Sequence, residues 1–158
     1  MLVSALEWTM IRIERSALLP YSADKLFDLV NDVSAYPQYM DGCVNATILA
    51  SSETIMEAHL ELRKGGISQR FATRNLLEKP HKIVMELLDG PFDTLHGEWT
   101  FKTLAQDACK VSLQLQFQIQ QNSLHQSVAQ KAAGKLFENV AGNLVDALCK
   151  RANTLYGQ

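Results

Sequence analysis

Hydrophobic and polar residues alternate along most of the first 120 residues, a period of two that is typical of β-strands with one buried face. The alternation is complete over residues 111–119, VSLQLQFQI, which places five apolar side chains on one face and four polar ones on the other. Strands are predicted over residues 10–19, 43–50, 54–64, 67–78, 81–88, 93–103 and 108–119. Turn residues separate these segments, among them the pair Gly65-Gly66, so the pattern predicts an antiparallel meander.

Two segments follow a helical spacing instead. Ser22 is suited to cap a helix whose apolar stripe contains Leu26, Phe27, Leu29, Val30 and Val33. Pro37 disfavours helical geometry at Tyr36, so residues 31–40 are expected to form a short second helical turn and a loop. From residue 123 to residue 156 apolar residues recur in steps of three and four, which predicts one amphipathic helix about 50 Å long.

This order of elements predicts an α+β helix-grip fold, with a curved antiparallel sheet of six to seven strands around one long C-terminal helix. The 158 residues suit a single domain over residues 10–158, preceded by an N-terminal extension over residues 1–9. No run approaches the roughly 18 apolar residues of a membrane span. The first residues lack the positive charge of a signal peptide, so a cytoplasmic location is expected.

Charge and cysteine content narrow the classes of partner and site. The formal net charge is −2, so the chain lacks the basic field that drives binding to phosphates, and DNA is not an expected partner. Cys43, Cys109 and Cys149 are odd in number and far apart, which argues against a disulfide framework and a thiolate metal site. The sequence contains none of the motifs G-x-S-x-G, G-x-x-x-x-G-K-[ST], G-x-G-x-x-G and H-E-x-x-H. These absences favour a non-catalytic binding domain.

A curved sheet closed over one helix often leaves its concave side incompletely filled, which favours an apolar cavity. The residues expected to line that cavity are Phe71, Met85, Leu87, Trp99, Phe101, Phe117, Phe137, Val140 and Leu144. Two loops are expected to rim its mouth, with Tyr36, Tyr39 and Met40 on one and Pro91 and Phe92 on the other. Exposed aromatic side chains there would suit a lid or transient contact with a membrane. The alternative is that these side chains plug the ends of the core.

The hairpin around Gly65-Gly66 carries a basic group of residues, namely Arg63, Lys64, Arg70 and Arg74. We call this group the basic hairpin. Two interpretations stay open at this point. The four side chains form either a solvated strand tip or a contact surface for an acidic partner.

Three stretches carry a specific resemblance to a known family: ERSALLPYSADKLFDLVNDVSAYPQYMDGC, GGISQRFATRN and LLDGPFDTLHGEWTF. They resemble the START-like family (SRPBCC, polyketide cyclase/dehydrase-like), in the branch that joins bacterial ribosome association toxins with mitochondrial coenzyme Q-binding proteins. The resemblance runs from about residue 11 to residue 156, and the length and order of the chain are closer to the bacterial toxins. Asp41 stands where the family pattern Y-P-x-[FY]-x-P-x-C has proline, which puts the rigidity of that loop in doubt.

The resemblance implies a helix-grip fold with a hydrophobic cavity, no metal, no required cofactor and no established catalytic residues. It also implies two roles. The first hypothesis is a protein that binds ubiquinone or a similar lipid in support of respiration. The alternative is association with the large ribosomal subunit, which blocks subunit joining and inhibits translation, with the basic hairpin as the candidate contact. A cyclase-type enzyme is a third alternative, and it would require acid-base groups that point into the cavity.

Overall fold

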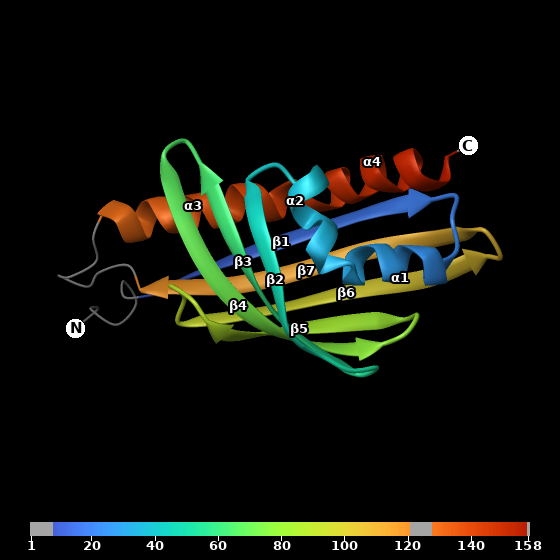
Figure 1. Cartoon of the computed structure of the whole chain (residues 1–158), viewed down its shortest axis with the longest axis horizontal. Coiled ribbons are helices and arrows are strands. Elements are labelled where there is room, and N and C mark those ends of the chain that lie inside the picture. The colour runs from blue at the N-terminus through green and yellow to red at the C-terminus, as the bar shows by residue number, and fades with distance from the viewer. Residues whose placement is uncertain (1–7, 121–127, 158) are drawn as a thin grey trace.

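The computed structural model describes residues 8–120 and 128–157, which form one antiparallel sheet of seven strands with helices packed against it (Figure 1). The strands are β1 (Trp8–Leu19), β2 (Cys43–Ser51), β3 (Ile55–Lys64), β4 (Ile67–Glu78), β5 (Lys82–Asp89), β6 (Thr94–Ala105) and β7 (Ala108–Gln120). The helices are α1 (Ala23–Asn31), the 3-10 turn η2 (Val33–Ala35), α2 (Tyr36–Tyr39), α3 (Val128–Gly142) and α4 (Leu144–Tyr156).

The strand order is β1-β7-β6-β5-β4-β3-β2, so β1 pairs with the last strand and the others follow as a meander. This confirms the predicted sheet. Gly65 and Gly66 have φ angles of 60° and 81°, the left-handed region that a tight hairpin requires. β1 begins at Trp8, so Trp8 and Thr9 lie in the sheet and not in the expected N-terminal extension.

The helix after β1 is confirmed. The backbone N–H of Lys25 donates to Oγ of Ser22 at 3.3 Å, which caps α1 as expected. The expectation for Tyr36 is wrong, because its φ of −51° and ψ of −43° are helical. Pro37 is tolerated in the first turn of α2, where a missing N–H costs no helical hydrogen bond. Tyr36 is also held in place by its hydroxyl, which donates to the carbonyl of Val30.

The single C-terminal helix predicted from the apolar spacing is two helices in the structure, and its first residues, 123–127, lie outside the described part. α3 ends at Gly142, Asn143 has φ −100° and ψ 3°, and α4 begins at Leu144. Glycine and asparagine are both poor helix formers, and here they are consecutive. The side-chain amide of Asn143 donates to the carbonyl of Asn139 at 2.9 Å, which satisfies one of the last carbonyls of α3.

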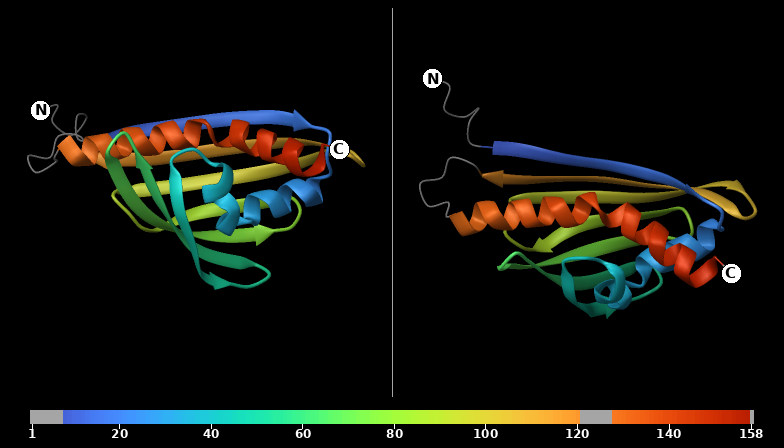
Figure 2. Two further views of the ribbon diagram at one scale, coloured as in Figure 1. Left: turned by 45° about the horizontal axis from the view of Figure 1, so that its top comes forward. Right: turned by 90° about the horizontal axis from the view of Figure 1, so that it is seen from above.

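The sheet is strongly curved, and β2, β3 and β4 cross the long strands β1, β6 and β7 at a steep angle (Figure 1). Figure 2 shows α3 and α4 running along β1, with α1 beside α4. The predicted alternation on β7 is confirmed for Val111, Leu113, Leu115 and Phe117, which are all buried. No helix within the described part of the chain has the length and apolar character that crossing a membrane requires.

Candidate functional site: an apolar cavity between the sheet and α3

A cavity of about 80 Å³ lies between the inner face of the sheet and the helices α2 and α3. Its walls are almost entirely apolar. The residues that line it are Val33, Tyr36, Met40, Ala58, Leu60, Leu62, Phe71, Thr73, Asn75, Met85, Leu95, Trp99, Leu115, Phe137, Val140, Ala141 and Leu144. They come from strands β3 to β7, from η2, α2, α3 and α4, and from the loop after α2, so the cavity sits where the sheet curls around α3.

Most of the side chains predicted to line the cavity lie on its wall: Phe71, Met85, Trp99, Phe137, Val140 and Leu144. Phe101 is absent from the wall because it packs under α1, with its ring centroid 5.5 Å from that of Phe27. Phe117 packs against Phe137 at 4.8 Å, in the core beyond the cavity. Leu87 is half-buried against the core and also lies off the wall.

Two polar residues of the wall were missed by the sequence analysis. Thr73 and Asn75 share the inward parity of Phe71 and Leu77 on β4, so alternation along that strand was a signal that could have found them. The hydroxyl of Thr73 donates to Oδ1 of Asn75 at 3.0 Å. Asn75 is only 7% exposed, and it is the one buried polar residue among those with described side chains.

Gly97 makes room for the floor of the cavity. It faces inward on β6, opposite Met85 of β5 and Leu115 of β7. A Cβ at this position would lie 2.5 Å from Cε of Met85 and 2.8 Å from Cδ1 of Leu115. Both side chains reach the cavity because position 97 has no side chain of its own.

The residues predicted at the mouth separate into two groups. Tyr36 and Met40 lie on the cavity wall, whereas Tyr39 is half-buried with the guanidinium of Arg151 over its ring at 5.2 Å. Pro91 is half-buried and Phe92 is buried, and neither lines the cavity.

Phe92 is buried, which contradicts the expectation of an exposed aromatic side chain at a loop tip. Its burial agrees with the alternative that this side chain plugs the end of the core. Its ring centroid lies 4.7 Å from that of Phe137 and 5.3 Å from that of Phe117. Gly90 lets the loop lie directly against Phe71, because a Cβ there would be 2.9 Å from Cβ of Phe71. The loop is therefore folded down onto the aromatic core.

A polar clasp closes one edge of the site. Nζ of Lys64 donates to Oδ2 of Asp41 and to Oδ1 of Asn139, both at 2.9 Å, and so joins β3, the loop before β2 and α3. Next to it, Gly42 has a φ of 92°, and a Cβ there would lie 2.8 Å from Cγ2 of Val140. Asp41, the departure from the family pattern, is thus held by an ion pair.

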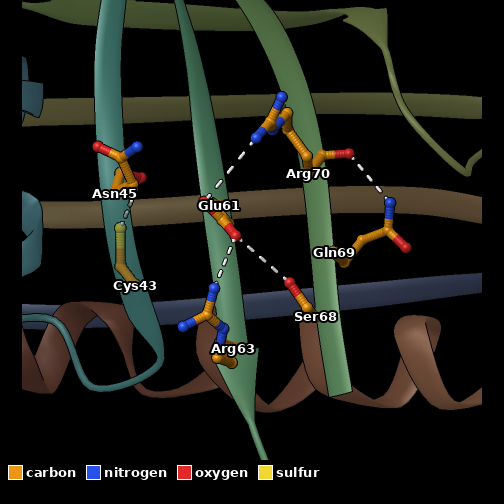
Figure 3. Close-up of polar contacts among 7 residues, drawn as sticks. All are labelled: Cys43, Asn45, Glu61, Arg63, Ser68, Gln69 and Arg70. Atoms are coloured by element: carbon orange, nitrogen blue, oxygen red, sulfur yellow. Dashed lines mark hydrogen bonds and ion pairs between the residues drawn. The ribbon is translucent and has the colours of Figure 1, made fainter. Parts of the chain in front are cut away.

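Each cation of the basic hairpin has a carboxylate partner. Figure 3 shows Glu61 between Arg63 and Arg70, with nitrogen–oxygen distances of 3.1 Å and 4.0 Å. Nε of Arg74 lies 2.7 Å from Oε2 of Glu57, and Lys64 pairs with Asp41. Because Glu61 serves two arginines, the four cations share three carboxylates, and the exposed hairpin is only partly compensated in charge.

Titratable groups near the cavity are held neutral by burial. Desolvation raises the pKa of the Cys43 thiol to about 11, and it raises the pKa of Tyr36 well above its ordinary value. The described cysteines, Cys43, Cys109 and Cys149, are free thiols. Within residues 8–120 and 128–157, no group of three His, Cys, Asp or Glu side chains is arranged to hold a metal ion.

The chain is similar in sequence to two bacterial toxins and, more distantly, to a coenzyme Q-binding protein. "Ribosome association toxin RatA" of Pseudomonas aeruginosa is 47% identical, with 92% of this chain and 97% of that protein covered. "Persistence and stress-resistance toxin PasT" of Escherichia coli is 41% identical, with 96% and 92% covered. A more distant relative is "Coenzyme Q-binding protein COQ10 homolog B, mitochondrial" of Xenopus laevis, 24% identical with 94% and 60% covered.

Solved structures confirm the START-like helix-grip fold. The Zhui aromatase/cyclase from a Streptomyces species superposes with a TM-score of 0.76 at 18% identity, covering 92% of this chain and 94% of that one. A START superfamily protein from Mycobacterium smegmatis superposes with a TM-score of 0.72 at 21% identity, covering 91% and 98%. The family model described as "Polyketide cyclase / dehydrase and lipid transport" matches residues 19–149. The chain therefore belongs to this START-like family of polyketide cyclases, dehydrases and lipid transport proteins.

Proposed function

We propose that this protein associates with the large ribosomal subunit in the cytoplasm, blocks subunit joining and so inhibits translation. The observation that carries the proposal is 47% identity to a ribosome association toxin over nearly the whole length of both chains. Respiration-linked ubiquinone binding, the first hypothesis from the sequence, has weaker support, because the coenzyme Q-binding relative is 24% identical.

The basic hairpin is the candidate contact for ribosomal RNA. Figure 1 shows the tip of the β3–β4 hairpin projecting past α3. Its ion pairs lie at the surface, where such pairs contribute about 0–1 kcal/mol. The arginine side chains are more exposed than Glu57 and Glu61, so phosphate oxygens can reach them, and their planar guanidinium groups suit phosphate.

Co-sedimentation with purified ribosomal subunits tests this function. We expect the wild-type protein to travel with the large subunit and to lower the fraction of joined ribosomes. The charge reversal Arg63→Glu with Arg70→Glu should abolish both effects. Lys102→Glu with Lys110→Glu, at the exposed ends of β6 and β7, is the matched control and should leave them unchanged. Absence of wild-type protein from the ribosomal fractions would refute the function, and unchanged binding of the hairpin variant would refute the contact.

A second candidate function is non-catalytic binding of an apolar molecule in the cavity. The wall described above contains no Asp, Glu, His, Lys or Arg side chain. Its one titratable group, the Tyr36 hydroxyl, donates to the carbonyl of Val30 and has a raised pKa. A cyclase would need an acid or base in contact with the substrate, so this wall favours binding over catalysis.

The size of the cavity limits what it holds as it stands. Pockets for drug-sized ligands usually measure about 300–1,000 Å³, and this cavity measures about 80 Å³. A whole isoprenoid quinone therefore requires the cavity to widen, whereas a compact group fits the present shape. Native mass spectrometry of protein from its own host tests the candidate. A bound apolar molecule at one per chain would support it, and an empty protein would leave ribosome association as the remaining function.

A further inference from the structure

The polar pair inside the apolar cavity is the feature that ordinary core packing explains least. Thr73 and Asn75 stand on the inner face of β4, and the residues beside Asn75 on the neighbouring strands are Met56 and Met85. Met56 is buried, and Met85 lines the cavity with the pair. An amide in such surroundings costs free energy unless its polar atoms find partners.

Half of that requirement is met within the protein. The Thr73 hydroxyl donates to Oδ1 of Asn75 at 3.0 Å, which fixes the direction of the amide. No hydrogen bond among the described residues is donated by Nδ2 of Asn75, although the residue is more than nine-tenths buried and lines the cavity. The amide nitrogen carries two N–H groups, so the cavity presents a donor that lacks an acceptor.

We propose that Thr73 and Asn75 form a recognition site for a hydrogen-bond acceptor, a ketone or ether oxygen, on an apolar ligand in this cavity. The inference rests on the second candidate function, ligand binding, and it specifies the ligand's chemistry. The apolar wall takes a compact hydrocarbon ring or the compact end of a longer molecule. The Asn75 amide donates to its oxygen, and Thr73 holds the amide in that orientation.

Two probes of equal shape test the proposal. Cyclohexanone carries the acceptor, and methylenecyclohexane replaces the oxygen with a CH₂ group. Dissociation constants of both are measured on the full chain by ¹H–¹⁵N NMR, which also reports the Asn75 side-chain amide directly. In the wild type, cyclohexanone should move the Asn75 amide proton resonances downfield, and methylenecyclohexane should not.

Three variants isolate the hydrogen bond. Asn75→Leu keeps the approximate size of the side chain and should weaken ketone binding relative to alkene binding by about threefold to tenfold. Thr73→Val is isosteric and keeps Asn75 but removes the hydroxyl that orients its amide. It should therefore cause a smaller change in the same direction, and it is the variant to use if Asn75→Leu does not fold. Gln69→Leu makes the same amide-to-leucine change on the same face of β4 but off the cavity wall, and it should leave the ratio unchanged.

The outcomes test the recognition site and ligand binding in the cavity separately. If both probes bind and the ratio is the same in wild type and in Asn75→Leu, the recognition site is refuted while ligand binding stands. If neither probe perturbs cavity resonances in the wild type, ligand binding fails and the recognition site fails with it. A ratio that shifts equally in Gln69→Leu would also refute the assignment.

Discussion

Single residues on the sheet decide how much space the core contains. Gly97 is the clearest case, since two side chains of the cavity floor occupy the position where its Cβ would be. Asn75 has a different effect, because it and Thr73 bring polarity to a cavity wall that is otherwise almost entirely apolar. Neither residue stands out from its own strand as a recognisable motif, yet each shapes the cavity.

Gly97→Ala should destabilise the protein by about 1 kcal/mol, at the low end of the cost of overpacking, because the atoms it meets are side-chain ends that border the cavity and can shift. The added methyl group would collide with Met85 and Leu115. Urea denaturation measures the change in the free energy of unfolding. Ser112→Ala, a change on the half-buried outer side of β7, is the control and should stay within about 0.5 kcal/mol of the wild type. Equal stability of Gly97→Ala and wild type would contradict the close packing.

The Cys43 thiol predicts a loss of stability in alkali. Burial raises its pKa from about 9 to about 11, so the folded state keeps the thiol neutral where the unfolded chain ionises it. The stabilising contribution is complete below pH 9 and is lost as the pH rises to about 11. The thermal midpoint should therefore fall over this window, and it should fall less in Cys43→Ala. Parallel pH profiles for the two proteins would contradict the effect.

At the scale of elements, the alternation of the strands was predictable and the continuity of the last helix was not. Steps of three and four place apolar residues on one face, and both α3 and α4 keep that face toward the sheet. The spacing does not reveal the break, because the apolar residues keep their steps of three and four across Asn143, although the backbone of Asn143 is not helical. The signal was local, in the consecutive Gly142 and Asn143, and the strong periodicity outweighed it.

The apolar character of the cavity wall was predictable from the sequence, but the exact residues that line it were less so. Inward parity identified Phe71, Met85 and Trp99, because a pleated strand directs alternate side chains to one face. Parity does not tell where along a strand the cavity lies. Phe101 has the correct face but is covered by α1, and Leu87 pairs with Thr73 next to a register shift between β4 and β5. Such offsets depend on tertiary packing.

Two glycines near the C-terminal end of α3 predict opposite effects of alanine. Gly142→Ala meets only ordinary contact, with Nη2 of Arg15 at 3.5 Å, and should stabilise the protein by about 0.4–1 kcal/mol through a less flexible unfolded chain. Gly42→Ala should destabilise it by more than that, because φ is 92° and Val140 is 2.8 Å away. Thermal and urea unfolding of both variants measure the pair. A stabilising Gly42→Ala would contradict the described approach of α3.

At the scale of the whole molecule, net acidity and ribosome association are compatible because charge is arranged locally. The chain has a formal net charge of −2, yet four cations gather on one exposed hairpin. Their carboxylate partners hold them in place at the surface. A partner rich in phosphate has to compete with those carboxylates.

Ribosome association should therefore weaken steeply with salt. With about four phosphate contacts, a rise from 50 to 200 mM salt should lower affinity by about a hundredfold. Removing one contact with Arg70→Gln should reduce the slope of log affinity against log salt by about one. Co-sedimentation across a salt series measures both slopes. A salt-independent association would show that the contact is not electrostatic and would exclude the basic hairpin.

Lys64 belongs to the clasp at the cavity edge and to the basic hairpin at once. A ligand that widened the cavity by moving α3 would separate Asn139 from Lys64 and so change where the hairpin places that ammonium group. Such coupling is reciprocal by thermodynamic necessity, so the ribosome would alter ligand affinity by the same factor as the ligand alters ribosome affinity. The Lys64 ammonium group would then couple the occupancy of the cavity to the surface that contacts the partner.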